Sequence, residues 1–384
     1  MKRLTSIDML RGLVMIIMAL DHVRDMVTHP QSTDYSAAVD FAGSAGAWFF
    51  TRWVTHICAP TFVLLAGVSA FLYGAMRQRS IGEVARFLLS RGVWLIFIEL
   101  TVVNFAWAFN LLTMHILQVI WAIGCSMIAL SGLIWLPRIA IAAVGVVMIV
   151  AHNGLDRVQP LLSEATPAWV LLHIPGPLTI NGTPVALVIY PLIPWIGVMA
   201  LGYAIGSYFV GPNPARPKRL LHIGTLLTLS FFLMRVANLY GEPVGWTVHQ
   251  NTIATLISFF NVTKYPPSLQ FLLMTLGPAL MLLGWFERFT GRVAGSLVTI
   301  GRVSFFYYVV HLYVIHTIAV SIGLWQGFSI RDMTVLFLDY PASFGISLGG
   351  VYVVWVFTIL AMYPICAWFA GIKARRRGWW LQYL

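Results

Sequence analysis

Charged residues and cysteines are both scarce in this chain. Asp, Glu, Lys and Arg make up only 10% of its 384 residues, whereas hydrophobic residues make up 59%, and the mean hydropathy is +0.83. This composition excludes an ordinary soluble domain. The three cysteines, Cys58, Cys125 and Cys366, are scattered through apolar runs, which predicts neither a disulfide framework nor a metal site. We interpret them as small buried hydrophobic side chains.

Apolar runs of about 20 residues recur along the chain, and each is long enough to cross the hydrocarbon core of a membrane. We therefore predict an all-α fold: a polytopic transmembrane bundle of about ten helices, forming one integral-membrane domain over residues 1–384. A cleaved signal peptide is not expected, because Asp21 and His22 follow the first run and no A-x-A cleavage site comes directly after it. The predicted spans are 10–28, 47–75, 84–107, 111–134, 137–152, 187–210, 219–239, 268–287, 297–320 and 343–371.

The basic residues lie on one side of this predicted topology. With the N-terminus inside, 18 of the 24 Lys and Arg residues fall at cytoplasmic span ends, together with only three of the 13 acidic residues. This asymmetry predicts that both termini face the cytoplasm of a bacterial inner (plasma) membrane. The net charge of +11 then indicates membrane lipid as a partner and no nucleic acid. The sequence leaves the oligomeric state open, a homo-oligomer included.

The first span carries a cluster of ionisable residues near its end, namely Asp21, His22, Arg24 and Asp25. Ionisable side chains cost several kcal/mol at bilayer depth, so such a cluster indicates a functional site. The two carboxylates flank His22 within adjacent helical turns. Arg11 precedes His22 by eleven residues, which puts it on the same face about 16 Å away along the helix axis. This arrangement favours proton chemistry along a path through the membrane.

The second span contains a polar pair beside a proline. Arg52 and His56 are four residues apart and share a helix face. Pro60 should break the helix there, and backbone carbonyls freed beside a polar pair usually line a cavity. His56 and Arg52 are therefore candidate site residues. The alternative for His56 is a packed histidine bonded to a backbone carbonyl.

The ninth span presents an imidazole and a phenol on one stripe, because His311 follows Tyr307 by four residues and Tyr308 by three. His311 and Tyr308 are candidate site residues. His316 lies off this stripe and nearer the outer surface, and we interpret it as an interfacial residue.

Further features lie on the predicted outer side and in the third span. Lys264 and Tyr265 precede the eighth span, and a lysine beside a helix N-terminus attracts anions; a lysine that snorkels to the interface is the alternative. The longest loop, residues 153–186, is rich in Pro and Gly and has the length of a functional lid or binding loop. In the third span, Glu99 requires a basic residue nearby if it is charged.

The first span resembles a motif shared by transmembrane acyltransferases. Those proteins begin with I-D-x-L-R-G/A and carry a histidine, regarded as catalytic, eleven residues after the arginine; Asp8, Arg11 and His22 occupy these positions. The superfamily includes relatives of heparan-alpha-glucosaminide N-acetyltransferase and the sugar O-acyltransferases of acyltransferase family three. This chain is similar in particular to bacterial membrane proteins described as heparan-alpha-glucosaminide N-acetyltransferase-like. The matching stretches are D-H-V-R-D (21–25), T-H-I-C-A-P-T-F-V-L-L-A-G-V-S-A (55–70), Y-P-L-I-P-W-I-G-V-M-A-L-G-Y (190–203), K-Y-P-P-S-L (264–269), L-M-T-L-G-P-A-L (273–280) and G-R-V-S-F-F-Y-Y-V-V-H-L-Y (301–313).

The resemblance implies an acyl-CoA-dependent N- or O-acetyltransferase without a metal. Its donor would be acetyl-CoA or another acyl-CoA, which enters from the cytoplasm where Arg11 meets its phosphates. Its acceptor would be a glycan or amino sugar that presents an amine or hydroxyl on the outer side. The candidate binding residues are Arg11, Arg24, Arg52, Lys264, Tyr265 and Tyr308.

His22 would be the general base, because the pKa of an ordinary imidazole lies close to working pH. Asp21 or Asp25 would orient its ring. The hydrogen-bond donor to the developing oxyanion would be one of three residues, namely Arg52, His56 or His311. The heparan-degrading enzymes carry a loop histidine at the position of Gly46, so an acyl-histidine route would use His22 or His56 instead.

The competing class is a proton-coupled transporter, in which a membrane Asp/His/Arg cluster acts as a proton relay. Such permeases often have two related halves, whereas this sequence has one Asp-His cluster with no counterpart. A non-catalytic scaffold does not explain charges kept at bilayer depth. The sequence therefore favours the acyltransferase.

Overall fold

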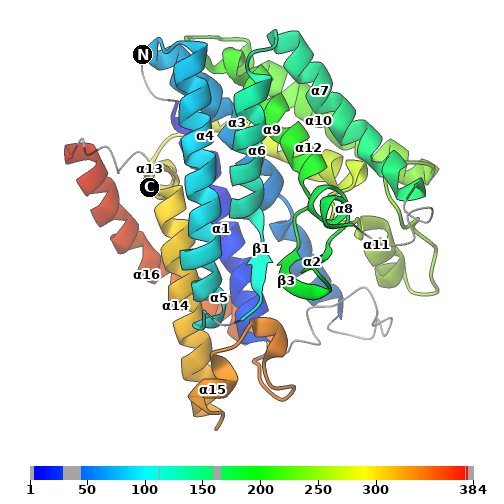
Figure 1. Cartoon of the computed structure of the whole chain (residues 1–384), viewed down its shortest axis with the longest axis vertical. Coiled ribbons are helices and arrows are strands. Elements are labelled where there is room, and N and C mark those ends of the chain that lie inside the picture. Colours follow the sequence, from blue (N-terminus) through cyan, green and yellow to red (C-terminus); the bar gives the residue numbers. More distant parts are fainter. Residues whose placement is uncertain (1–3, 29–44, 112, 159–165, 377, 379–384) are drawn as a thin grey trace.

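The computed structural model describes residues 4–28, 45–111, 113–158, 166–376 and 378 and is a bundle of long helices (Figure 1). The prediction of an all-α polytopic bundle is confirmed, and each predicted span overlaps helical structure. The central helix α1 (Thr5–Val27) and the shorter apolar helix α6 (Val119–Leu133) account for two of these spans. Eight further stretches of the described residues are long and apolar enough to cross a membrane: Gly46–Arg77, Ile81–Ala108, Arg138–Arg157, Leu192–Phe209, Arg216–Ala237, Leu269–Phe286, Ser304–Trp325 and Leu348–Arg375.

The remaining helices and the strands have the following bounds. The helices are α2 (Ala45–Thr55), α3 (Cys58–Arg77), α4 (Ile81–Ile98), α5 (Asn104–Ala108), α7 (Arg138–Ala151), α8 (Pro167–Leu172), α9 (Leu192–Ile205), α10 (Arg216–Ala237), α11 (Thr252–Phe260), α12 (Leu269–Phe286), α13 (Arg292–Arg302), α14 (Ser304–Trp325), α15 (Ile330–Met333) and α16 (Leu348–Arg375). The strands are β1 (His115–Leu117), β2 (Gly176–Ile180) and β3 (Thr183–Val188).

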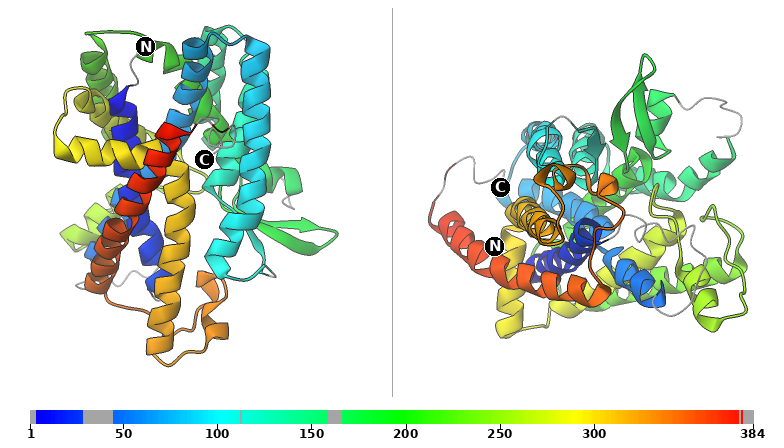
Figure 2. Two further views of the ribbon diagram at one scale, coloured as in Figure 1. Left: turned by 90° about the vertical axis from the view of Figure 1, so that its left-hand side faces the viewer. Right: turned by 90° about the horizontal axis from the view of Figure 1, so that it is seen from below.

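Two predicted spans are broken helices. The break predicted from Pro60 beside His56 is present, because α2 ends at Thr55 and α3 begins at Cys58. Pro60 thus lies in the first turn of α3, where its missing N–H group costs no helical hydrogen bond. The predicted span 297–320 consists of two helices, since α13 ends at Arg302 and α14 begins at Ser304. Figure 2 shows α13 lying across the direction of α14.

A small sheet lies at one side of the bundle and was not predicted. β3 pairs with β1 in parallel and with β2 in antiparallel orientation. The β2–β3 turn is Asn181-Gly182, and both residues have positive φ angles, which is the conformation that favours a tight hairpin. Part of the loop predicted over 153–186 is therefore regular structure.

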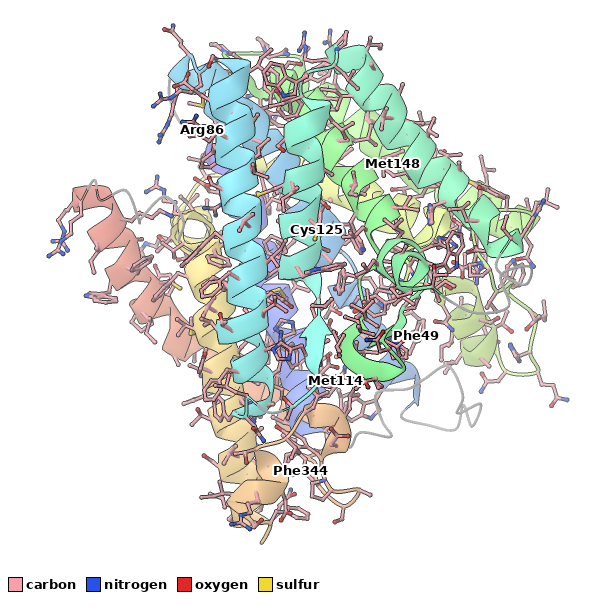
Figure 3. All side chains as sticks on the ribbon, in the orientation of Figure 1. Phe49, Arg86, Met114, Cys125, Met148 and Phe344 are labelled. Atoms are coloured by element: carbon pink, nitrogen blue, oxygen red, sulfur yellow. The ribbon has the colours of Figure 1, made fainter. Side chains whose placement is uncertain are left out.

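α1 lies in the interior and contacts α2, α3, α12, α13, α14 and α16. Most of its side chains are buried, so its ionisable residues face protein rather than lipid. Figure 3 places Arg86 at the end of the bundle where α1 and α4 begin and Phe344 at the opposite end. We call the first of these the basic end, because arginines gather there, including Arg11, Arg77 and Arg91.

Pairs of glycines face each other where helices cross. A Cβ atom on Gly301 would lie 1.8 Å from the Asp8 carbonyl oxygen, and one on Gly12 would lie 2.0 Å from the Leu297 carbonyl oxygen. Small residues let helix backbones approach closely in membranes, so the glycine after Arg11 fixes α1 against α13. The pairs are Gly12 and Gly301 (α1–α13), Gly67 and Gly202 (α3–α9), Gly92 and Gly124 (α4–α6), Gly145 and Gly197 (α7–α9), and Gly224 and Gly277 (α10–α12).

Replacing Gly301 with alanine should destabilise the protein, because overpacking typically costs about 1–3 kcal/mol and here the new atom meets backbone. We expect the thermal unfolding temperature of the solubilised protein to fall by several degrees or more. Gly295→Ala on the same helix is the control, since no atom lies within 4 Å of its added Cβ and alanine favours a helix by about 0.5–1 kcal/mol. Equal unfolding temperatures for the two variants would contradict the close approach of α1 and α13.

Candidate functional site

Four charged side chains meet at the C-terminal part of α1 and form what we call the ion cluster: Asp21, Arg24, Asp25 and Lys264. Arg24 Nη2 lies 3.0 Å from Asp21 Oδ1 and 2.5 Å from Asp25 Oδ1. Lys264 Nζ lies 3.2 Å from Asp21 Oδ2. Burial alone lowers the pKa of Lys264, but the Asp21 carboxylate outweighs this effect, so the pKa lies above its usual value. Lys264 is therefore a charged partner of α1, and the snorkelling alternative does not hold.

Beside the ion cluster, His22 forms a hydrogen-bonded pair with His311 of α14. His22 Nδ1 lies 2.7 Å from His311 Nε2, and the two rings stack with their centroids 4.9 Å apart. His311 Nδ1 lies 2.9 Å from the Tyr307 carbonyl oxygen. A carbonyl only accepts, so His311 Nδ1 carries the proton and its neutral ring has an acceptor at Nε2. His22 must then donate from Nδ1, which leaves the lone pair on its Nε2.

This geometry corrects two predictions. Neither Asp21 nor Asp25 forms a hydrogen bond with the His22 ring in the described structure, because both carboxylates bind Arg24 and adjacent helix residues point in different directions. His311 orients the ring instead. In this tautomer His311 also has no N–H group left for an oxyanion, since its Nδ1–H donates to Tyr307.

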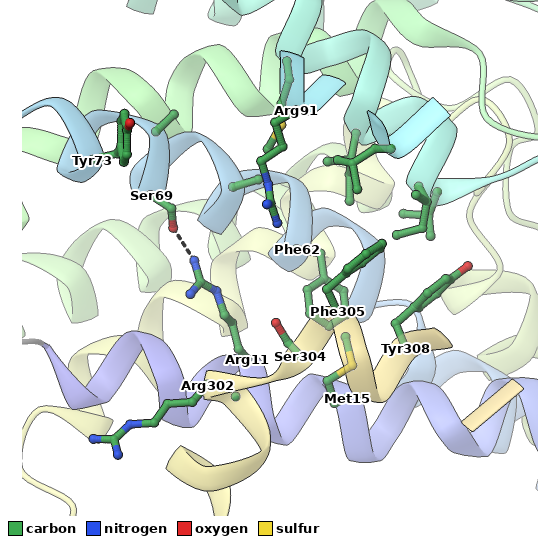
Figure 4. A pocket seen from close by; sticks show the side chains of 18 of the residues that line it. Arg11, Met15, Phe62, Ser69, Tyr73, Arg91, Arg302, Ser304, Phe305 and Tyr308 are labelled. Atoms are coloured by element: carbon green, nitrogen blue, oxygen red, sulfur yellow. Dashed lines mark hydrogen bonds between the residues drawn. The ribbon is translucent and has the colours of Figure 1, made fainter. Parts of the chain in front are cut away.

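A cavity of about 330 Å³, which we call the central cavity, runs along α1 toward this histidine pair (Figure 4). Its α1 wall is Arg11, Met15 and Met18, and His22 is the next residue on that helix face. Figure 4 shows Arg11 on one side of the cavity and Tyr308 on the other. The Tyr308 ring is nearly perpendicular to the His22 ring, with centroids 6.0 Å apart. Tyr308 thus lines the cavity and packs against His22, which is not itself a lining residue.

The two ends of the central cavity differ in chemistry. The residues near Arg11 include the cationic Arg91, Arg302 and Lys373, whereas apolar side chains such as Phe62, Leu95 and Ile123 line much of the rest. Arg11 donates to the Leu65 carbonyl oxygen at 3.3 Å and to the Ser69 hydroxyl. A second cavity of about 780 Å³, the surface cavity, shares Arg11, Ser69 and Tyr73 with the first and adds Arg77. A basic mouth thus leads into an apolar interior.

The predicted pair of Arg52 and His56 is not joined by a hydrogen bond among the described residues. His56 is 5% exposed, and neither of its ring nitrogens has a hydrogen-bond partner in the part of the chain that the structure describes. The alternative of a histidine bonded to a backbone carbonyl therefore does not hold either. Its ring packs against Phe271 with centroids 5.3 Å apart.

Two other buried polar residues were singled out in the sequence, and the prediction for His316 needs correction. Glu99 has no basic partner in the described structure; its Oε1 accepts from the Gln118 backbone N–H at 3.0 Å, and a π-helical turn begins at Glu99. His316 is fully buried rather than interfacial. Its two ring nitrogens lie 2.7 Å and 3.1 Å from backbone carbonyl oxygens, which makes it a bridge between segments of the fold.

A polar pocket of about 520 Å³ lies toward the opposite end from the basic end, and we call it the far-end pocket. His173 Nε2 lies 2.8 Å from Asp156 Oδ1 in its wall, a contact that sequence reasoning missed because seventeen residues separate the two. Tyr265 also lines the pocket, and Glu242 lies there with a pKa raised by burial. Lys264, beside Tyr265, connects this wall to Asp21. Among the described residues, no group of His, Cys, Asp or Glu has an arrangement suited to a metal ion.

The fold and the site define a polytopic membrane protein whose interior histidine pair lies beside a cavity with a basic mouth. Residues 3–237 match the family model described as heparan-alpha-glucosaminide N-acetyltransferase, catalytic. The match covers more than half of the chain, so the protein belongs to this family, which indicates a membrane acetyltransferase. No protein with a curated description matches the chain.

Proposed function

We propose that the protein transfers an acetyl group from acetyl-CoA, or another acyl group from its CoA thioester, to the amine or hydroxyl of a sugar. The observation that carries this proposal is the central cavity, whose basic mouth and apolar interior lead to His22. The cell membrane of a bacterium is the compartment that the composition and the positive-inside pattern favour.

The chemistry of the cavities matches the two parts of an acyl-CoA. Its phosphates need fixed cations, which Arg11 and Arg91 supply at the mouth of the central cavity and Arg77 supplies in the surface cavity. Its extended arm needs a narrow, mostly apolar passage, and the central cavity has such walls between Arg11 and Tyr308. A donor held in this way brings its thioester toward His22.

The tautomer of His22 suits a general base. The proton on Nδ1 is committed to His311, so the Nε2 lone pair is available to the attacking group. As the acceptor amine or hydroxyl attacks the thioester carbonyl, Nε2 takes its proton. The resulting imidazolium returns that proton to the departing CoA thiolate, which leaves as the thiol.

The far-end pocket is the region that we assign to the acceptor. It offers the Asp156 carboxylate, the Asn153 amide and the Tyr265 ring, a combination that suits hydroxyls and the apolar face of a sugar ring. With the basic end in the cytoplasm, as the positive-inside rule favours, this pocket opens on the outer side. Tyr265 lines the pocket, and Lys264 beside it belongs to the ion cluster, so the acceptor must pass these two residues.

Reconstitution tests the proposal. We expect protein in liposomes to release CoA from labelled acetyl-CoA and to label one member of a panel of amino sugars and glycans. Acetyl-CoA should act only from the side where the basic end is exposed, which vesicles of known orientation resolve. An absence of both CoA binding and turnover with every acceptor would overturn the proposal and favour a proton-coupled transporter, which a proton-flux assay on the same vesicles would detect.

A further inference from the structure

Buried tyrosine hydroxyls normally find a hydrogen-bond partner, so those that lack one call for an explanation. Among the described residues, three buried tyrosines have a hydroxyl without a partner: Tyr307, Tyr308 and Tyr340. Of these, only Tyr308 lines the central cavity. It is 2% exposed, and it comes from the same helix as His311.

We propose that the Tyr308 hydroxyl donates the hydrogen bond that stabilises the oxyanion formed when the thioester carbonyl is attacked. This inference rests on the proposed function and assigns a residue whose role that function leaves open. The thioester carbonyl of the acyl-CoA becomes a tetrahedral oxyanion when the nitrogen or oxygen of the acceptor bonds to the carbonyl carbon. A preorganised hydrogen-bond donor in a site that excludes water stabilises this developing negative charge most strongly.

The fold holds Tyr308 and the base in a fixed relation. Tyr308 and His311 are three residues apart on α14, and His311 is hydrogen-bonded to His22 at 2.7 Å. The Tyr308 ring meets the edge of the His22 ring at a centroid distance of 6.0 Å. One rigid helix therefore places Tyr308 in the cavity wall and orients the base beside it.

The other candidates fit this role less well. Among the described residues, His56 has two unpartnered ring nitrogens, but it lies between α2 and α3 and does not line the central cavity. Among the described residues, Glu99 also has an unpartnered oxygen, but its side chain does not line the central cavity. His311 uses its only N–H group on Tyr307.

The reaction balances with these groups alone. The acceptor's proton moves to His22 Nε2 as its nitrogen or oxygen bonds to the carbonyl carbon. The Tyr308 hydroxyl keeps its own proton and only shares it with the oxyanion. When the carbon–sulfur bond breaks, the carbonyl re-forms and the thiolate takes the proton from His22.

The decisive variant is Tyr308→Phe, which removes only the hydroxyl. Loss of an oxyanion donor should lower kcat by about 10² to 10³-fold, with KM for acetyl-CoA and the thermal unfolding temperature little changed. Tyr340→Phe is the matched control, since its hydroxyl is also buried and unpartnered but its side chain lines none of the cavities described above. It should retain full activity. A Tyr308→Phe enzyme with wild-type kcat, or with only a raised KM, would overturn the inference.

Fluorotyrosine at position 308 gives a second measurement in case the phenylalanine variant folds poorly. Fluorine makes the phenol a stronger acid while the ring and its hydroxyl stay in place. The alkaline limb of the kcat–pH profile should then move to lower pH, and an unmoved profile would contradict the role. If wild-type protein transfers acetyl groups and these variants behave like it, only this inference fails; if wild-type protein transfers none, the proposed function fails as well.

Discussion

Replacing His22 with glutamine should abolish acetyl transfer while acetyl-CoA still binds. Glutamine has no basic nitrogen to take the acceptor's proton, and loss of a general base typically costs about 10² to 10⁴-fold in rate. The cavity walls that we assign to the donor are made by other residues, from Arg11 to Tyr308. We therefore expect kcat to fall by about 10³-fold or more, measured as CoA release, and the dissociation constant for acetyl-CoA to stay within a small factor.

The matched control is His222→Gln, because His222 is an exposed histidine on α10 far along the chain from the histidine pair. It should turn over at the wild-type rate. Full activity in a correctly folded His22→Gln protein would rule out the general-base role of His22 and would make His56 the next candidate for the catalytic histidine. Covalent acyl-enzyme trapped on wild-type protein but not on the variant would instead indicate a nucleophilic His22.

The spans and the reactive helix could be predicted from the sequence because their signals are local. Apolar runs of sufficient length predict membrane helices directly. Charged residues within such a run, as in α1, indicate a functional site even when their spatial neighbours are unknown. The three-and-four spacing put Arg11 and His22 on one helix face, and the cavity follows that face. These inferences need only the geometry of one helix.

The partners of these residues could not be predicted, because they come from distant segments. His22 and His311 are separated by 289 positions, and Asp21 and Lys264 by 243. The sequence therefore favours the nearest carboxylates as partners of His22. In the structure, Arg24 binds both of them instead.

The breaks in the helices show the same limit in the backbone. Pro60 indicated that a break occurs, but a proline in the first turn of a helix and a proline at a kink have the same sequence signature. The break between α13 and α14 has no proline at all. It arises where α13 packs across α1 through Gly301 and Gly12, which is a tertiary contact.

Replacing His311 with leucine should lower kcat by about 10² to 10³-fold even though His311 does not touch the reacting atoms. The leucine leaves the His22 Nδ1–H without an acceptor, and an unpaired buried donor costs about 1–3 kcal/mol. The ring can avoid that cost by moving its proton to Nε2, which removes the lone pair that acts as the base. In hydrolases that rely on an oriented histidine, holding that histidine in the wrong tautomer lowers the rate severely.

His311→Gln separates this positioning role from simple packing. The glutamine side-chain oxygen can accept from His22 Nδ1–H, so this variant should recover most of the lost kcat, while leucine should not. Both variants should bind acetyl-CoA like the wild type, since His311 does not line the central cavity, and both should be compared at matched thermal unfolding temperatures. If leucine and glutamine impaired kcat equally, the hydrogen bond from His22 would not be the contribution of His311, and the tautomer that defines the base would have to be set by another group.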